Sequence, residues 1–132
     1  MAKIKLDNVT LLALGSTQIK ENIAALQFSM RGIDFGAVKF ISHEQPAEVP
    51  LGIQYEKFND FENISYKEFS YYCIYKLIEH VETEFMLMIH PDGFVINPDS
   101  WTDEFMEWDY IGAPWPLMDT AFIDPFGNHQ RV

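Results

Sequence analysis

The sequence predicts an α/β fold, in which helices cover both faces of a mostly parallel sheet. An apolar run at residues 9–14 is followed by a helical pattern and by a second apolar run at 37–42. This is the strand–helix–strand order that a parallel crossover requires. A second helical pattern at 65–81 leads into the apolar run 85–89. Strands that alternate with helices in this way are typical of a three-layer α/β/α architecture.

Length and charge narrow the class of protein further. With 132 residues, the chain fits a single domain spanning residues 1–132. The formal net charge of -11 disfavours binding to nucleic acid or to anionic lipid, because both are negatively charged themselves. An aromatic content of 15% indicates either a core rich in Phe and Tyr or a surface on which a base or sugar stacks.

The compartment is predicted from cysteine usage and from hydropathy. Cys73 is the one cysteine, so the chain has no intramolecular disulfide, which suits a reducing compartment. Its place in a helical pattern beside aromatic residues favours packing over a nucleophilic role. Residues 1–7 lack the apolar stretch of a signal peptide, and no window approaches the roughly 18 apolar residues of a membrane span. We therefore expect a cytoplasmic protein without a transmembrane segment.

The first helix is predicted by apolar residues spaced three and four apart, which are Ile19, Ile23, Leu26 and Met30. Ser16 or Thr17 can cap the start of this helix, and Gly32 can end it. After the strand at 37–42, the loop 43–52 contains two prolines, and 53–55 is expected to be a short strand.

The second helix is expected over 65–81, with one apolar face made of Ile74, Leu77, Ile78 and Val81. The unbroken apolar run 85–89 is of the type found at the centre of a parallel sheet. A short return strand at 94–96, a helical turn at 103–107 and a strand at 110–111 complete the expected elements. From Pro114 onward, we expect irregular structure.

The first candidate site lies at the carboxyl end of the first strand, where Gly15, Ser16 and Thr17 precede the helix. In open α/β sheets, ligands bind beyond the carboxyl ends of the strands. Small residues let the backbone approach a ligand, and free N–H groups at a helix start can receive a phosphate or a base carbonyl. Ordinary turn chemistry with a helix cap explains the same residues, so the motif leaves both interpretations open.

The second candidate site follows the strand 85–89, where the chain reads His90-Pro91-Asp92-Gly93. A carboxylate directly after a buried strand must be solvated or paired. Carboxylate oxygens suit Mg²⁺ or Mn²⁺, which also bridge the oxygens of a diphosphate. His90 lies two residues before Asp92, so in an extended segment both side chains face the same side. The alternative is that Asp92 and Gly93 only make a turn.

A longer stretch, from Phe85 onward, carries a family resemblance. It reads FMLMIHPDGFVINPDSWTDEFMEWDYIGAPWP. The turn Asp92-Gly93-Phe94, Asn97-Pro98, Trp101 and the segment from Asp109 to Trp115 resemble a family of proposed glycosyltransferases that was formerly a domain of unknown function. The segments VTLLALG, LQFSMRGIDFG and Ser42-His43-Glu44 are similar to the opening of that family. The resemblance covers residues 9–116.

The resemblance implies a fold of the GT-A type, which is a Rossmann-like domain that binds a nucleotide-sugar. Such domains carry an Asp-x-Asp-like metal motif after a central strand, and the resemblance implies that Asp92 occupies its last position. His90 stands at the first position, where the class has Asp and family members usually have Gln. The implied cofactor is Mn²⁺ or Mg²⁺, held by Asp92 and His90.

The segment from Asp109 to Trp115 is expected to face the donor sugar. The small residues that precede Trp115 would let its ring and backbone lie close to a sugar, and Asp109 can bind a sugar hydroxyl. Two alternatives stay open. The segment can be a structural corner with a buried Trp115, and Asp109 can cap a helix or strand.

The expected function is that of a glycosyltransferase-like protein, which binds a UDP- or GDP-sugar donor for transfer to an acceptor hydroxyl. The expected donor-binding residues are Gly15, Ser16, Thr17, Asp92, Gly93, Asp109 and Trp115. The family resembled here continues past this region, so we expect a C-terminally truncated domain, without an identified catalytic base for an inverting transfer. The alternative is a non-catalytic binding or assembly module of the same fold, which forms a homo-oligomer through an exposed C-terminal edge.

Overall fold

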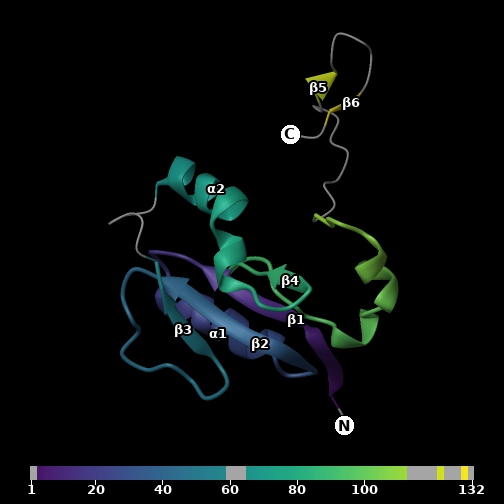
Figure 1. Ribbon diagram of the computed structural model, residues 1–132, viewed down its shortest axis with the longest axis horizontal. Coiled ribbons are helices and arrows are strands. Elements are labelled where there is room, and N and C mark those ends of the chain that lie inside the picture. The colour runs from purple at the N-terminus through teal and green to yellow at the C-terminus, as the bar shows by residue number, and fades with distance from the viewer. Residues whose placement is uncertain (1–2, 59–64, 113–121, 124–128, 131–132) are drawn as a thin grey trace. The chain divides into compact units, whose positions relative to one another are not determined.

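The computed structural model describes residues 3–58, 65–112, 122–123 and 129–130 (Figure 1). The chain divides into two compact units, residues 1–101 and residues 102–132. The second unit contains the 3-10 helix η3 (Asp103–Glu107) and two short antiparallel strands, β5 (Phe122–Ile123) and β6 (His129–Gln130). The predicted helical turn at 103–107 is confirmed. The α/β fold belongs to the first unit.

The first unit is built on a four-stranded, all-parallel sheet with the strand order β3-β2-β1-β4. The predicted α/β class and the parallel sheet are confirmed. The arrangement is compatible with a Rossmann-like fold, and it does not by itself identify the GT-A type. The elements in chain order are β1 (Ile4–Leu14), α1 (Ile19–Ser29), β2 (Ile33–Ser42), β3 (Gln54–Lys57), α2 (Tyr66–Tyr75), the 3-10 helix η1 (Leu77–His80), β4 (Phe85–Met88) and the 3-10 helix η2 (Pro98–Ser100).

The α1 face of the sheet is covered by an apolar core. Leu11 and Ala13 of β1 pack with Val38 and Phe40 of β2 and with Leu26 of α1. Alternate residues of a strand point to the same face, so each strand supplies every second side chain to this layer. Leu26 has an exposed fraction of 0%, and the predicted apolar face of the first helix is confirmed.

The opposite face of the sheet is covered by α2 and η1, which lie above it in Figure 1. They pack on the other set of alternate strand residues, including Leu12, Leu14 and Ile41. The start of α2 is fixed by a capping box, in which the Ser65 hydroxyl accepts from Glu68 N and the Glu68 carboxylate accepts from Ser65 N. Within the described residues, no helix is long and apolar enough to span a bilayer.

The predicted helix over 65–81 is wrong in its extent and in half of its buried face: Leu77 is buried and Val81 packs against the core, whereas Ile74 and Ile78 are exposed. The α-helix ends at Tyr75, and η1 follows as a 3-10 helix. Since a 3-10 helix has three residues per turn, the face defined by a spacing of 3.6 does not continue beyond Lys76. Ile74 and Ile78 are 70% and 76% exposed, although the periodicity predicts that they are buried.

Three strand predictions also need correction. β4 pairs with β1 at the end of the described sheet, so it is not the central strand that its apolar run predicts. Residues 94–96 form no strand, since the chain makes only a single bridge between His90 and Gly93, and Val95 N donates to the Ser29 hydroxyl at 3.0 Å. Residues 110–111 are not a strand either. Long-range pairing decides these cases, and short apolar runs do not report it.

Candidate functional site

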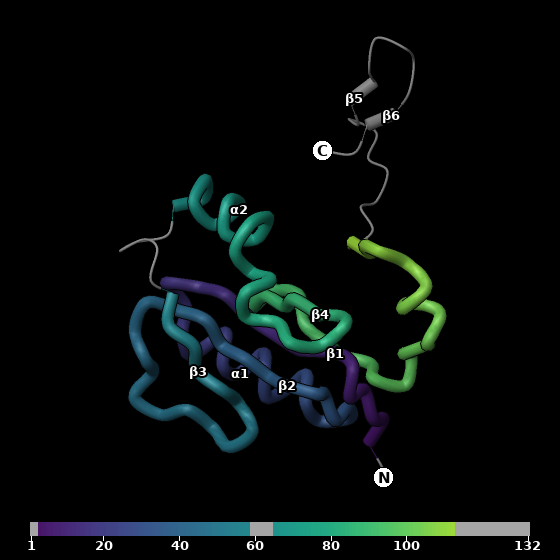
Figure 2. The backbone as a smooth tube through the Cα atoms, viewed as in Figure 1, coloured from purple at the N-terminus to yellow at the C-terminus, as the bar shows by residue number. Residues whose placement is uncertain are grey.

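The strand order creates a switch point between β1 and β4. The chain runs from β1 through β2 to β3 on one side of β1, and β4 then pairs with the other side of β1 (Figure 2). The register extends from Val9 opposite Phe85 to Leu12 opposite Met88, and Ile89 N donates to Leu12 O at 2.9 Å. In open α/β sheets, the carboxyl ends of the strands at such a switch point bound the ligand crevice.

Both predicted site segments follow these two neighbouring strands. Gly15, Ser16 and Thr17 come directly after β1, and the turn from His90 to Gly93 comes directly after β4. Neighbouring strands of a sheet are about 4.8 Å apart. The fold therefore brings to one edge two segments that are more than seventy residues apart in the sequence.

The start of α1 differs from the predicted cap. Its N-cap is Gln18, which has a left-handed backbone (φ 53°, ψ 43°) and makes no side-chain cap hydrogen bond. Ser16 and Thr17 do not cap the helix, so that prediction is wrong. A non-glycine residue in this conformation carries backbone strain, which is common at ligand sites. The first N–H groups of α1 carry a partial positive charge that favours an anion.

Asn22 holds this strained turn in place. Its Nδ2 donates to Gln18 O at 3.0 Å and to Thr17 O at 3.3 Å. A Cβ at Gly15 would lie 3.0 Å from the same Nδ2, so the small size of Gly15 makes room for the Asn22 amide. This contact agrees with the turn interpretation that the sequence left open, and the ligand interpretation stays a prediction.

Two buried polar atoms at this edge have no hydrogen-bond partner among the described residues: Asn22 Oδ1 and His43 Nε2. Asn22 is 3% exposed. His43 follows β2, and its ring lies edge-on to Phe58, with the centroids 4.8 Å apart. An unpaired buried polar atom costs about 1–3 kcal/mol, so such atoms mark positions where a ligand or water completes the bonding.

The turn after β4 is tight and open to solvent. His90 N donates to Gly93 O at 3.0 Å, and Gly93 N donates to His90 O at 3.1 Å. His90 and Asp92 are exposed, and a Cβ at Gly93 would have nothing within 4 Å. The carboxylate of Asp92 is therefore solvated, as the sequence requires of a charged group at this position.

The predicted metal ligands form an incomplete set. Within the described parts of the chain, no group of three or more His, Cys, Asp or Glu side chains is placed to hold a metal ion. The predicted ligands, Asp92 and His90, are two side chains of one turn. Mg²⁺ is commonly bound by one or two carboxylates together with water and ligand phosphates, so two protein ligands fit a cation that arrives with a diphosphate.

The last two predicted donor-binding residues do not belong to the described part of the first unit. Asp109 is exposed and belongs to the second unit. Trp115 lies outside the described residues. The predicted donor-binding residues that lie in the described part of the first unit are Gly15, Ser16, Thr17, Asp92 and Gly93.

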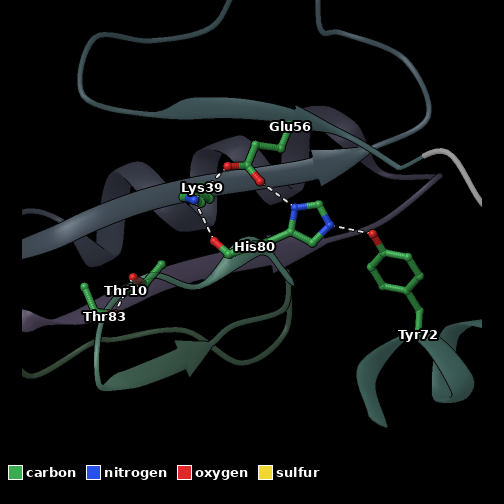
Figure 3. A network of polar contacts seen from close by, with 6 residues as sticks. All are labelled: Thr10, Lys39, Glu56, Tyr72, His80 and Thr83. Carbon is green, nitrogen blue, oxygen red and sulfur yellow. Dashed lines mark hydrogen bonds and ion pairs between the residues drawn. The ribbon is translucent and has the colours of Figure 1, made fainter. Parts of the chain in front are cut away.

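A buried polar network on the α2 face was not predicted from the sequence (Figure 3). Lys39 Nζ lies 2.7 Å from Glu56 Oε1 and donates to His80 O at 2.6 Å. The other carboxylate oxygen of Glu56 bonds His80 Nδ1, and Tyr72 OH bonds His80 Nε2. The network thus joins β2, β3, η1 and α2. Its signal in the sequence is Lys39, a charge inside an apolar strand, because a buried Lys requires a partner.

The charges of this network are matched internally. Burial by itself would raise the pKa of Glu56, but hydrogen bonds from Lys39 and His80 outweigh burial and hold that pKa below its ordinary value. The side chain of Lys39 is 6% exposed, and that of Glu56 is 32% exposed. Nearby, burial raises the pKa of the Cys73 thiol, which keeps it protonated and agrees with a packing role. The network therefore fastens η1 to the sheet.

Comparison with known proteins identifies the family. The model of the family described as "Protein of unknown function (DUF5672)" matches residues 53–130, which is more than half of the chain. The chain belongs to this family. The range shared with the DUF5672 family includes β3, β4 and the turn from His90 to Gly93. No curated protein and no solved structure matches the chain.

Membership of the DUF5672 family corrects one prediction. The chain was expected to belong to a family of proposed glycosyltransferases, and this is wrong, because the matching family is one of unknown function and no comparison shows a glycosyltransferase signature. The motif position assigned to Asp92 depended on that resemblance. A role for Asp92 must therefore be argued from its place in the fold.

Proposed function

We propose that this protein binds a nucleotide-sugar donor at the carboxyl ends of β1 and β4, for transfer of the sugar to an acceptor hydroxyl. The observation that carries the proposal is the switch point, where Gly15, Ser16 and Thr17 and the turn from His90 to Gly93 follow neighbouring strands. Mononucleotides and dinucleotides bind at such points in doubly wound sheets.

The diphosphate of the donor needs positive charge, because the chain has a net charge of -11. The start of α1 supplies part of it through N–H groups that no side chain caps. Asp92 and His90 would hold Mn²⁺ or Mg²⁺, which neutralises phosphate oxygens when it is bound. The start of α1 follows β1, and the turn that would hold the cation follows β4. These two strands are neighbours at the switch point.

Recognition of the base or ribose is supported by the unpaired buried atoms. Asn22 Oδ1 is an acceptor, and a base N–H or a ribose hydroxyl would complete its bonding. His43 Nε2 donates or accepts according to its tautomer, so it suits either kind of group. A ligand that lacks such groups leaves these atoms unpaired, which gives the site selectivity.

The second candidate function is a non-catalytic binding module of the same fold. The observation that favours it is the single carboxylate, Asp92, in the turn after β4. The two candidates share donor binding and differ in chemistry. Release of nucleoside diphosphate from the donor in the presence of acceptors separates them.

The test is a thermal unfolding titration with UDP- and GDP-sugars, each with and without Mn²⁺. A donor at one hundred times its Kd stabilises the folded state by about 2.7 kcal/mol, so the Tm should rise. We expect the Mn²⁺-dependent part of the rise to disappear in Asp92→Asn. Asp7→Asn is the matched control, because Asp7 is an exposed carboxylate in the amino-terminal half of β1.

Two results would contradict the proposal. One is the absence of a Tm shift with every donor, in a sample that unfolds cooperatively. The other is a Tm shift in Asp92→Asn equal to that of the parent protein and of Asp7→Asn, which would leave the turn after β4 without a role in donor binding.

A further inference from the structure

The amino-terminal half of β2 has a neighbouring strand on one side only. β1 pairs with β2 from Ile33 onward, whereas pairing with β3 begins at Lys39. Residues 34–37 therefore form a free sheet edge on the side where β3 later joins. The chain enters β3 through a turn at Gly52 (φ 91°), where an added Cβ would lie 3.1 Å from Met30 Cε. A free strand edge presents unpaired N–H and C=O groups to any extended chain that approaches it.

Two hollows flank this free edge, one on each face of the sheet. Their volumes are about 430 Å³ and about 580 Å³. Both are lined by Gly36 and Ala37 of β2 and by Gln54 at the start of β3. An extended chain added along 34–37 would direct alternate side chains to the two faces, and so into the two hollows.

The hollow on the α1 side has polar and apolar lining surface in about equal parts, and its apolar part faces the core. Its walls include Met30, Phe35, Val38 and Ile53, which belong to the apolar core of that face or pack against it. Its charged residues are Lys3 and Asp34, whose charged atoms are 3.9 Å apart. This hollow suits an aliphatic side chain, because burial of its apolar surface against the apolar walls is favourable in free energy.

The hollow on the α2 side is polar and acidic. It is lined by Lys39, Glu56 and Thr83 (Figure 3), and by the exposed Glu82. Lys39 and Glu56 neutralise each other as an ion pair, which leaves the carboxylate of Glu82 as the excess charge. A Lys or Arg side chain therefore suits this hollow.

We propose that residues 34–37 of β2 bind an extended peptide in which aliphatic and basic residues alternate. The peptide pairs with the backbone of β2 in line with β3, its aliphatic side chains enter the α1-side hollow, and its basic side chains enter the α2-side hollow. Main-chain hydrogen bonds supply affinity in this mode, and the hollows supply specificity. This site is separate from the carboxyl edge and does not depend on nucleotide-sugar binding.

Charge favours a basic peptide over a second copy of the chain. Two copies joined through this edge would bring together molecules that each carry a net charge of -11. Asp34 and Glu82 of both copies would approach the same interface, and like charges across a pair of strands are destabilising. A basic partner instead brings positive charges toward Asp34 and Glu82, which is favourable.

The test uses the whole chain and the synthetic peptide acetyl-(Val-Lys)4-amide. We expect saturable binding in isothermal calorimetry, with the largest amide shifts in NMR spectra at residues 34–38. Two further peptides are N-methylated at alternate residues, one on each alternate set. Each of them lacks half of the backbone N–H donors. One alternate set should abolish binding and the other should preserve it, since only one set of N–H groups in an added strand faces β2.

A charge variant tests the α2-side hollow without altering the backbone. Glu82→Lys should weaken the Val-Lys peptide about fivefold or more, because an exposed ion pair is replaced by repulsion. Glu84→Lys is the matched control, since Glu84 is exposed in the same connection and does not line the hollow. A Val-Glu peptide should bind the parent protein more weakly than the Val-Lys peptide does.

Three outcomes would overturn the proposal. The two N-methylated peptides bind equally well, which excludes strand pairing. The amide shifts fall on other elements, which excludes this edge. Sedimentation of the chain alone shows a dimer whose amides 34–38 are protected, which makes a second copy the occupant.

Discussion

On one face of the sheet, α1 covers an apolar core, whereas on the other face α2 and η1 cover an apolar cluster together with a chain of polar side chains. Leu26 on the α1 side is fully buried, and Ile74 and Ile78 on the α2 side are largely exposed. The α2 side also holds Lys39, Glu56, His80 and Tyr72, which are joined by hydrogen bonds and ion pairs.

This difference shows that the helical spacing of apolar residues does not by itself report which of them are buried. In α1 the spacing agrees with the buried face at Ile23 and Leu26. The second helical segment changes geometry at Lys76, and η1 then turns Leu77 and His80 toward the sheet. The two layers should therefore respond differently to the same kind of substitution.

The largest expected effect is a loss of stability when a buried apolar residue of the α1 layer is shortened, compared with an exposed one of the α2 layer. Leu26→Ala should lower the free energy of unfolding by about 2–5 kcal/mol, because it removes buried methyl groups and leaves a cavity. Ile74→Ala, the matched change on an exposed aliphatic side chain, should alter it by no more than about 0.5 kcal/mol. Urea denaturation measures both values. Similar losses in the two variants would mean that Ile74 is buried in solution.

A smaller effect tests the polar interior of the α2 side. Glu56→Gln keeps the size of the side chain and leaves the Lys39 ammonium buried without its carboxylate. Breaking a buried ion pair costs about 3–5 kcal/mol, and because Glu56 is about a third exposed, solvent screening reduces the expected loss to about 1–3 kcal/mol. Lys39→Met combined with Glu56→Gln should recover part of this loss. Failure of the double variant to recover would show that the charges were not coupled.

The smallest effect is the pH dependence of the same network. The pKa of Glu56 is lowered in the folded state relative to its ordinary value of 4.5. The stabilisation is therefore fully present above pH 4.5 and is lost as the pH falls through the folded-state pKa. In urea titrations, the stability difference between the parent protein and Glu56→Gln should shrink as the pH falls through the folded-state pKa of Glu56. A constant difference down to the acid limit of folding would exclude Glu56 as the titrating group.

Much of the fold could be predicted from local patterns. The apolar runs that became β1, β2 and β4 were recognised, and the parallel arrangement followed from the helix between the first two. The strand ends at Gly15 and His90 were recognised as site segments because parallel strands end at the same edge of a sheet. The pairing of β1 with β4, which makes these segments neighbours, was not predicted, since the sequence does not report which strands lie side by side.

The sequence by itself determined the α/β class, the apolar layer of α1 and the position of Asp92 after an apolar strand. These properties depend on residue spacing and on the local cost of burying charge. The tertiary structure alone decided the switch point, the unpaired atoms of Asn22 and His43, and the network around Glu56. Each of these joins residues from different elements, and such contacts form only when long-range packing brings the elements together.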